Sequence, residues 1–281
     1  MKYSRYSSYD SKQLQDIVSE IPRIHVPKKK VALCYWGIAR STDFTIESIE
    51  RNIWKPLEDA NIEYTTFVHT FSVNKPYTNS RASEWNIHLK NDIWKMLLPD
   101  HYIVENQEDI DKILDFKKYR SHGDPWEVEQ VSMYQKYSTH DNLIRALYSL
   151  SKVTNLWKPM ASTFDAVIYL RPDVRFISPL NVEWIHECRR GNIYAPNFHL
   201  VDDWNDRFAI GKPADMILYG SRFQDAYQYS LYKPLHSEGF LSEYMKKHKI
   251  KPTHIFFLFR RIRADNHICP ADETIENSMK L

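Results

Sequence analysis

Apolar residues in the first part of the chain follow a pattern typical of buried strands, then one typical of a helix. Residues 31–36 (VALCYW) form a continuous apolar run closed by Gly37, as expected of a strand buried on both faces. Ser41 or Thr42 can cap a following helix, in which apolar residues recur at helical spacing: Ile46, Ile49, Ile53 and Leu57. Residues 64–71 (YTTFVHTF) are the next apolar run. Strand, helix and strand in this order predict a βαβ unit.

The pattern weakens in the middle of the chain and becomes clear again after residue 139. The middle part predicts a helix near residues 84–97, a strand at 101–104 and a polar loop at 121–130. A long amphipathic helix is expected over residues 139–158, leading into the apolar strand 164–170. The remaining patterns predict strands at 192–198, 207–211 and 253–259 and helices at 221–232 and 237–247.

The order of these elements predicts an α/β fold with a mainly parallel, mixed central sheet flanked by helices. We expect an N-terminal extension at residues 1–30, one domain at 31–270 and a C-terminal tail at 271–281. Ligands of such sheets bind at the carboxyl ends of the strands, where residues 37–40 and 171–173 fall. These two polar segments are therefore expected to share one cleft.

Composition narrows the classes of partner and compartment. The 281 residues include 38 Lys and Arg against 36 Asp and Glu, which leaves no general basic field for nucleic acid. The cysteines are isolated at positions 34, 188 and 269, which favours a reducing compartment. The sequence has no signal-peptide pattern and no apolar run of the roughly 18 residues that a membrane span needs. We therefore expect a cytoplasmic protein without a membrane span.

Several catalytic classes have no motif in this sequence. Only six glycines are present, and the closest two, Gly211 and Gly220, are too far apart for a dinucleotide-binding or Walker phosphate loop. There is no His-Glu-x-x-His of a zinc protease and no Gly-x-Ser-x-Gly of an α/β-hydrolase. The chemistry is therefore expected to come from Arg, Asp, Glu and His.

The strongest candidate site follows the buried strand 164–170. Asp173 lies just beyond this strand, where a carboxylate can coordinate Mg²⁺ or Mn²⁺ bridging a diphosphate. Arg171 and Arg175 flank it with guanidinium groups suited to phosphate. The alternative interpretation is a structural Asp–Arg pair that caps the strand.

This arrangement resembles the GT-A fold of nucleotide-sugar glycosyltransferases. The segments YLRPDV (residues 169–174) and NDRFAIGKP (205–213) are similar to predicted glycosyltransferases encoded by large algal viruses, the chloroviruses among them. The resemblance spans about residues 31–266 and implies that Asp173 matches the last Asp of the metal-binding Asp-x-Asp motif. Arg171 replaces the first Asp, so the sequence leaves open whether Mn²⁺ or Mg²⁺ is required.

The same resemblance implies further donor and metal contacts. Arg40 follows the first strand, where such enzymes hold the nucleotide, and Arg145 on the helix 139–158 can reach the donor. Arg263 is expected to bind the leaving diphosphate, and His267 to complete the metal site with Asp173. The alternatives are surface cations, an Asp141–Arg145 pair within the helix and a basic surface strand.

Two carboxylates are candidates for the catalytic base of an inverting transfer. The resemblance to inverting GT-A enzymes, which often carry their catalytic carboxylate at such a position, makes Glu238 at the expected N-terminus of the helix 237–247 the first choice. There it can remove a proton from the acceptor hydroxyl. Asp206 is the second, in a segment where Asp202, Asp203 and Trp204 also suit contacts with a sugar. Each residue also has a purely structural interpretation: Glu238 can be a carboxylate that caps the helix, and Asp206 can belong to a charged turn.

These residues lead to one main functional prediction. We expect a hexosyl- or pentosyltransferase that moves a sugar from a nucleotide diphosphate donor, UDP-linked and with xylose as one candidate, to an oligosaccharide or glycoprotein acceptor. If the viral resemblance holds, the reaction takes place in the host cytoplasm. Two alternatives remain open at this point: a non-catalytic carbohydrate-binding module and a nucleotide-binding scaffold.

Overall fold

A computed structural model describes residues 28–126, 136–273 and 275, which form an α/β fold around a seven-stranded, mostly parallel sheet. The spatial order of its strands is β10–β8–β9–β6–β1–β2–β5. Two small two-stranded sheets, β3–β4 and β7–β11, accompany it. The strands are β1 (Lys30–Trp36), β2 (Glu63–Ser72), β3 (Tyr77–Asn79), β4 (Glu84–Ile87), β5 (His101–Asn106), β6 (Ala166–Leu170), β7 (Val174–Phe176), β8 (Asn192–Pro196), β9 (Phe208–Gly211), β10 (Lys251–Ile255) and β11 (Phe259–Arg261).

The pairing of the central strands places the two expected polar segments side by side. β1 pairs in parallel with β2 on one side and with β6 on the other, and β9 alone runs antiparallel to its neighbours. In the β1–β6 register Tyr35 lies opposite Leu170, so that both strands end at the same edge of the sheet. Residues 37–40 and 171–173 therefore leave the sheet next to each other.

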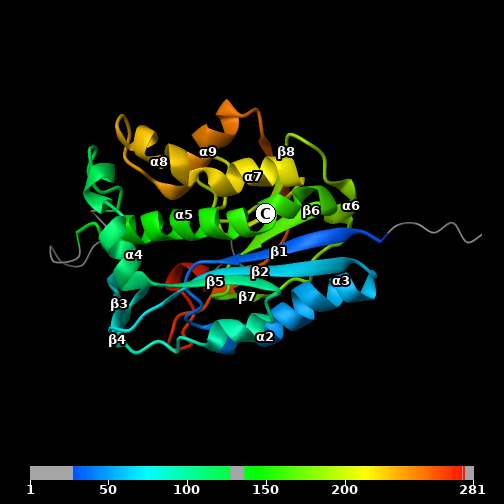
Figure 1. Cartoon of the computed structure of the whole chain (residues 1–281), viewed down its shortest axis with the longest axis horizontal. Helices are drawn as coiled ribbons and strands as arrows, with labels where there is room; N and C mark the ends of the chain where they lie inside the picture. The colour runs from blue at the N-terminus through cyan, green and yellow to red at the C-terminus, as the bar shows by residue number, and fades with distance from the viewer. Residues whose placement is uncertain (1–27, 127–135, 274, 276–281) are drawn as a thin grey trace, which may run out of the picture.

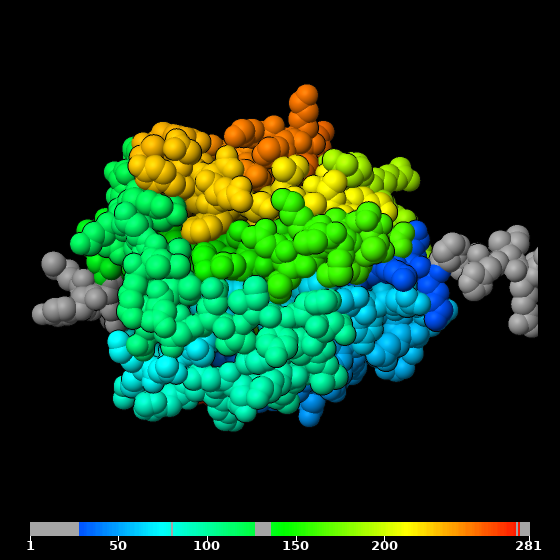
Figure 2. Space-filling model, in the orientation of Figure 1, coloured from blue at the N-terminus to red at the C-terminus, as the bar shows by residue number. Residues whose placement is uncertain are grey.

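Helices cover both faces of the sheet (Figure 1). In this view the long helix α5 lies across one face below α7, α8 and α9, and α2 and α3 lie on the opposite side. Figure 2 shows the same layers in space-filling form, with the green residues around α5 between the yellow and orange C-terminal helices and the cyan N-terminal half. The helices are α2 (Thr42–Ile49), α3 (Lys55–Asp59), α4 (Gln107–Ile113), α5 (Ser138–Trp157), α6 (Glu183–Glu187), α7 (Pro213–Ser221), α8 (Phe223–Ser230) and α9 (Ser237–Lys247), with a π-helical turn, Glu50–Trp54, between α2 and α3.

The alternation of side chains along the strands divides the core into two layers. Cys34 and Trp36 of β1 pack with α5 on one face, and Leu33 and Tyr35 pack with α2 on the other. All four are buried. The continuous apolar run 31–36 therefore has the meaning predicted for it, a strand covered on both faces.

Most expected elements are present, and two are wrong. The helix expected over residues 84–97 is instead the strand β4 followed by a short 3₁₀ helix, Ile93–Leu97, because residues 84–87 pair with β3 in a hairpin. The single strand expected over 253–259 is two strands in different sheets: β10 ends at Ile255, and β11 begins at Phe259 and pairs with β7. The fold class itself is confirmed.

No helix in the described part of the chain is long and apolar enough to cross a membrane. Most of the expected N-terminal extension, residues 1–30, lies outside the described residues, as does part of the polar loop 121–130.

Candidate functional site

A cavity of about 770 Å³ opens at the carboxyl ends of β1 and β6. Its walls come from the segment after β1, the β3–β4 hairpin, one face of α5, the turn after β6, the start of α9 and the segment after β11. Among the described residues, eight arginines and three carboxylates line it: Arg40, Arg81, Arg145, Arg171, Arg207, Arg222, Arg261 and Arg263, against Asp173, Asp206 and Glu238. The two polar strand ends do share one cleft, as predicted.

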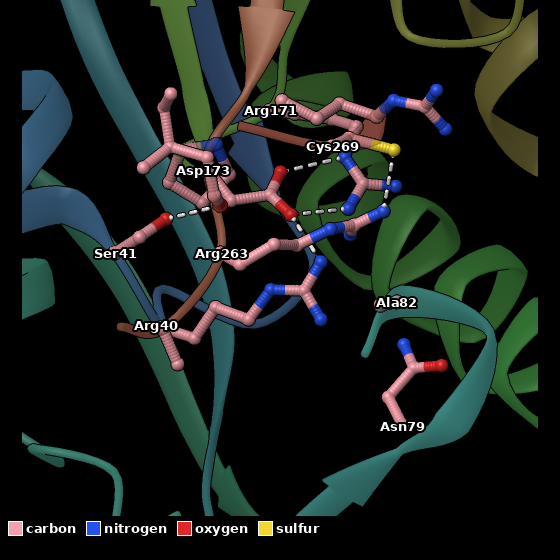
Figure 3. Close-up of polar contacts among 12 residues, drawn as sticks. Arg40, Ser41, Asn79, Ala82, Arg171, Asp173, Arg263 and Cys269 are labelled. Atoms are coloured by element: carbon pink, nitrogen blue, oxygen red, sulfur yellow. Dashed lines mark hydrogen bonds and ion pairs between the residues drawn. The ribbon is translucent and has the colours of Figure 1, made fainter. Parts of the chain in front are cut away.

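Asp173 lies at the centre of an arginine cluster (Figure 3). Its side chain is fully buried, and Arg171 donates two hydrogen bonds to it, from Nε to Oδ1 at 2.8 Å and from Nη2 to Oδ2 at 2.7 Å. Arg40 donates a third, from Nη2 to Oδ2 at 2.8 Å. Burial opposes ionisation of this carboxyl, but Arg171 and Arg40 outweigh it and hold the pKa of Asp173 below its usual range. The carboxylate therefore stays charged and orients both guanidinium groups.

Arg40 is fixed from a second side by the β3–β4 hairpin. Its Nη1 donates to Glu84 Oε2 at 2.9 Å and to the Tyr77 hydroxyl at 2.7 Å. Glu84 is fully buried and also accepts the backbone N–H of Ala264 at 2.9 Å. Arg40 thus bridges two carboxylates, and the hairpin forms a wall of the cavity rather than a surface excursion.

Arg263 adds a third guanidinium beside Asp173 without a carboxylate of its own. It is 7% exposed, and its Nη2 donates to the Cys269 sulfur at 3.0 Å. Among the described residues Arg263 forms no ion pair within 4 Å, and burial and the charge of Arg40 lower its pKa. A buried cation repelled by its neighbour is an arrangement that an anion would stabilise.

Two carboxylates that share Arg207 line another part of the cavity. Glu238 lies in the first turn of α9, as expected, and Arg207 contacts both Glu238 (3.4 Å) and Asp206 (3.7 Å). Burial and the charge of Asp206 raise the pKa of Glu238 to about 7. For Asp206, burial is outweighed by Arg207 and by the hydroxyl of Ser237, which lower its pKa. One group is therefore ionised, and the other can exchange a proton near neutral pH.

Arg145 lines the cavity from α5 but is held by a partner outside it. Its guanidinium makes two hydrogen bonds to Asp111, of 2.7 and 2.9 Å, and one to Asn142 of 2.8 Å. The alternative pair with Asp141 does not form, because Asp141 accepts two hydrogen bonds from Arg120 instead. The charge of Arg145 is thus partly compensated by Asp111.

The expected metal ligands do not fit a divalent cation. Both oxygens of Asp173 are occupied by guanidinium groups, which would repel a cation. The ring nitrogens of His267 are bonded to Asp265 and, at 3.1 Å, to the carbonyl of Ala82, and His267 is not among the residues lining the cavity. No group of three or more His, Cys, Asp or Glu in the described residues could hold a metal ion. We therefore derive no step through Mn²⁺ or Mg²⁺.

Other candidates fall outside the cavity. Trp204 is buried in the core (1% exposed), so it presents no face to a sugar. Asp202 and Asp203 are exposed in a turn, and Arg175 bonds to Asn266 and to the carbonyl of Phe44. Of the acidic segment only Asp206 reaches the site.

Sequence reasoning missed several residues of the site. The sequence assigns no role to Glu84 or Tyr77, because the pattern of residues 84–97 predicts a helix and not a hairpin. Arg222 was missed as well; it is 1% exposed, lines the cavity and stacks over the Tyr219 ring at 4.4 Å. Arg81 lies over the ring of Trp126 at 5.6 Å, and both line the cavity. No local signal in the sequence distinguishes Arg81 and Arg222 from ordinary surface arginines.

The architecture is consistent with a GT-A-like single domain. No protein-family model matches the chain, and no curated protein matches it. The resemblance to viral glycosyltransferases therefore stays a prediction, and the functional proposal depends on the residues of the cavity.

Proposed function

We propose that the cavity binds a nucleoside diphosphate sugar and transfers its sugar to an acceptor hydroxyl. The observation that carries this proposal is the cluster of Arg40, Arg171 and Arg263 around Asp173, in which Arg263 forms no ion pair with a carboxylate of the described residues. Guanidinium groups are suited to bidentate contacts with phosphate oxygens. A diphosphate next to Arg263 would supply the missing negative charge.

The cluster replaces the role that a divalent cation plays in many phosphate-binding sites. Charge develops on the diphosphate as the sugar leaves, and donors already oriented toward it lower the barrier. Asp173 and Glu84 hold Arg40 and Arg171 in place before the ligand arrives. Donor binding is therefore proposed to be independent of metal.

Glu238 is proposed to act as the base. The acceptor oxygen attacks the anomeric carbon and forms the new glycosidic bond, while the bond from that carbon to the diphosphate oxygen breaks. The bonding electrons stay on the diphosphate, and the acceptor proton moves to the Glu238 carboxylate. With a pKa of about 7 this carboxyl can take up the proton and lose it to water between turnovers. Asp206, held ionised by Arg207, keeps the pKa of Glu238 raised.

The substrates are proposed at the level of chemical class. The donor is a UDP-linked sugar, with xylose as one candidate, and the acceptor is an oligosaccharide or glycoprotein.

A product assay tests the proposal. The protein is incubated with a panel of UDP- and GDP-sugars and with glycan acceptors, and mass spectrometry records the addition of one sugar. We expect one donor to be used by the wild type, and no product from Glu238→Gln. Glu243→Gln, on the same helix but paired with Lys233 at the surface, is the matched control and should stay active. A folded wild type that transfers none of these sugars would contradict the proposal.

A further inference from the structure

The segment after β1 carries Arg40 to the cavity and is held there by side chains. Gly37 has a φ of +93°, in the left-handed region, and its backbone N–H donates to Ser149 Oγ at 2.8 Å. Two residues later, the N–H of Ala39 donates to Thr70 Oγ1 at 3.1 Å. The position of Arg40 thus depends on oxygen atoms of α5 and β2.

Ser149 is itself the end of a buried hydrogen-bonded chain. Its hydroxyl lies 2.7 Å from His69 Nδ1, and His69 Nε2 lies 2.8 Å from Glu105 Oε2. Glu105 also accepts from the Tyr148 hydroxyl at 3.2 Å and from Lys152 Nζ at 3.4 Å. The chain joins β5, β2 and α5 to the backbone of Gly37 at the cavity.

The polarity of the chain follows from its two ends. Glu105 accepts at one end, because His69 and its other donors hold its pKa at about 2 and keep it ionised. His69 Nε2 therefore carries the proton, and Nδ1 can accept from the Ser149 hydroxyl. The His69 carbonyl lies farther from this hydroxyl, at 3.2 Å, than Nδ1 at 2.7 Å. The Ser149 oxygen is then left with its lone pairs for the N–H of Gly37. Burial lowers the pKa of His69, which favours this neutral form.

The same residue types occur in serine hydrolases, but the geometry here gives no nucleophile. Ser149 and His69 are fully buried, and neither lines the cavity. The hydroxyl is committed to Gly37 and to His69, so it cannot attack a substrate.

We propose that Glu105, His69 and Ser149 are positioning residues that hold the segment Gly37–Arg40 so that Arg40 reaches Asp173. The expected effect on ligand affinity rests on the function proposed above. The expected effect on the mobility of the Gly37 backbone does not depend on that function. Loss of the Ser149 hydroxyl leaves the Gly37 N–H without its acceptor and loosens the segment at Gly37, while Thr70 still holds the N–H of Ala39.

Ser149→Ala tests the proposal, with Thr154→Val as the matched control. Thr154 is also fully buried in α5, but its hydroxyl bonds to the Leu150 carbonyl and to Tyr169, away from the cavity. We expect hydrogen exchange at the Gly37 amide to accelerate at least about tenfold in Ser149→Ala and to stay unchanged in Thr154→Val. Unchanged exchange at Gly37 in Ser149→Ala would overturn the proposal.

Calorimetric titration with inorganic pyrophosphate gives the second readout. We expect affinity to fall about fivefold in Ser149→Ala, the effect of one lost hydrogen bond, and to stay at the wild-type value in Thr154→Val. Equal losses in the two variants would mean that the chain only stabilises the core, and would overturn the positioning role. A wild type that binds no pyrophosphate would contradict the anion site, while Gly37 exchange would still decide whether the chain positions the segment.

Discussion

Replacing Asp173 by Asn removes the charge that holds the arginine cluster together. The carboxylate is fully buried and accepts three hydrogen bonds from Arg171 and Arg40, all between 2.7 and 2.8 Å. Removing one partner of a buried ion pair costs about 3–5 kcal/mol, because the remaining charge stays buried without compensation. For a chain of this size each kcal/mol lowers Tm by roughly 2 °C, so we expect Asp173→Asn to melt about 6–10 °C lower.

The pH dependence of this difference gives a second check. The pKa of Asp173 is lowered in the folded protein, so its contribution is present above the ordinary carboxyl pKa and is lost as the pH falls toward the folded value. Differential scanning calorimetry should therefore show the largest gap between the two proteins near pH 7 and a smaller one below about pH 4. A fall in Tm of about 2 °C or less at pH 7 would refute a structural role for this carboxylate.

A surface pair provides the control for this experiment. Asp59 and Lys55 are paired at 2.7 Å in an exposed position, and Asp59→Asn should lower Tm by about 1 °C or less. The comparison also limits what Asp173 variants can say about ligands. Because the cluster loses its organisation, a loss of donor binding in Asp173→Ala would not identify a direct contact.

Three further predictions concern the ligand and the reaction. Arg263→Met should weaken UDP binding at least about tenfold in calorimetric titrations. It should leave Tm equal or higher, because the guanidinium is buried and repelled by Arg40. An equal loss of UDP affinity in Arg175→Met, whose side chain lies outside the cavity, would mean that binding depends only on nonspecific charge. The rate of transfer measured as kcat/KM should rise with pH, reach half its maximum near 7, the pKa of Glu238, and level off above it, because the base must be ionised. A profile flat from pH 5 to 9 would exclude Glu238 as that base. Addition of EDTA should leave both UDP affinity and transfer rate unchanged, and restoration of lost activity by Mn²⁺ would show that the arginine cluster does not replace a metal.

The sequence predicts best those elements that depend on the pattern of neighbouring residues. The runs 31–36 and 164–170 identify β1 and β6 because strands buried on both faces must be apolar throughout, and the polar residues directly after them mark the cleft. Helix α9 begins at Ser237 and ends at Lys247, the bounds expected from its pattern. The sequence could therefore identify the site residues that lie next to these elements: Arg40, Arg171, Asp173 and Glu238.

Features that depend on distant pairing could not be predicted in this way. Glu84 lies on a short hairpin whose polar sequence resembles a helix, and its role depends on Arg40, which is 44 residues away in the sequence. The resemblance predicts His267 as a metal ligand, but a ring nitrogen of His267 is already bonded to Asp265, two residues away in the sequence. Ser149 lies within the helix expected over residues 139–158, and only the fold shows that this position faces His69 and Gly37.

The central claim is that the arginine cluster binds a nucleoside diphosphate. Calorimetric titration of UDP and GDP, with EDTA present, into the wild type and Arg263→Met tests it most directly. The account predicts binding of one nucleotide by the wild type and at least about tenfold weaker binding by the variant. A folded wild type that binds neither nucleotide but binds free glycans would contradict it and would favour a carbohydrate-binding module.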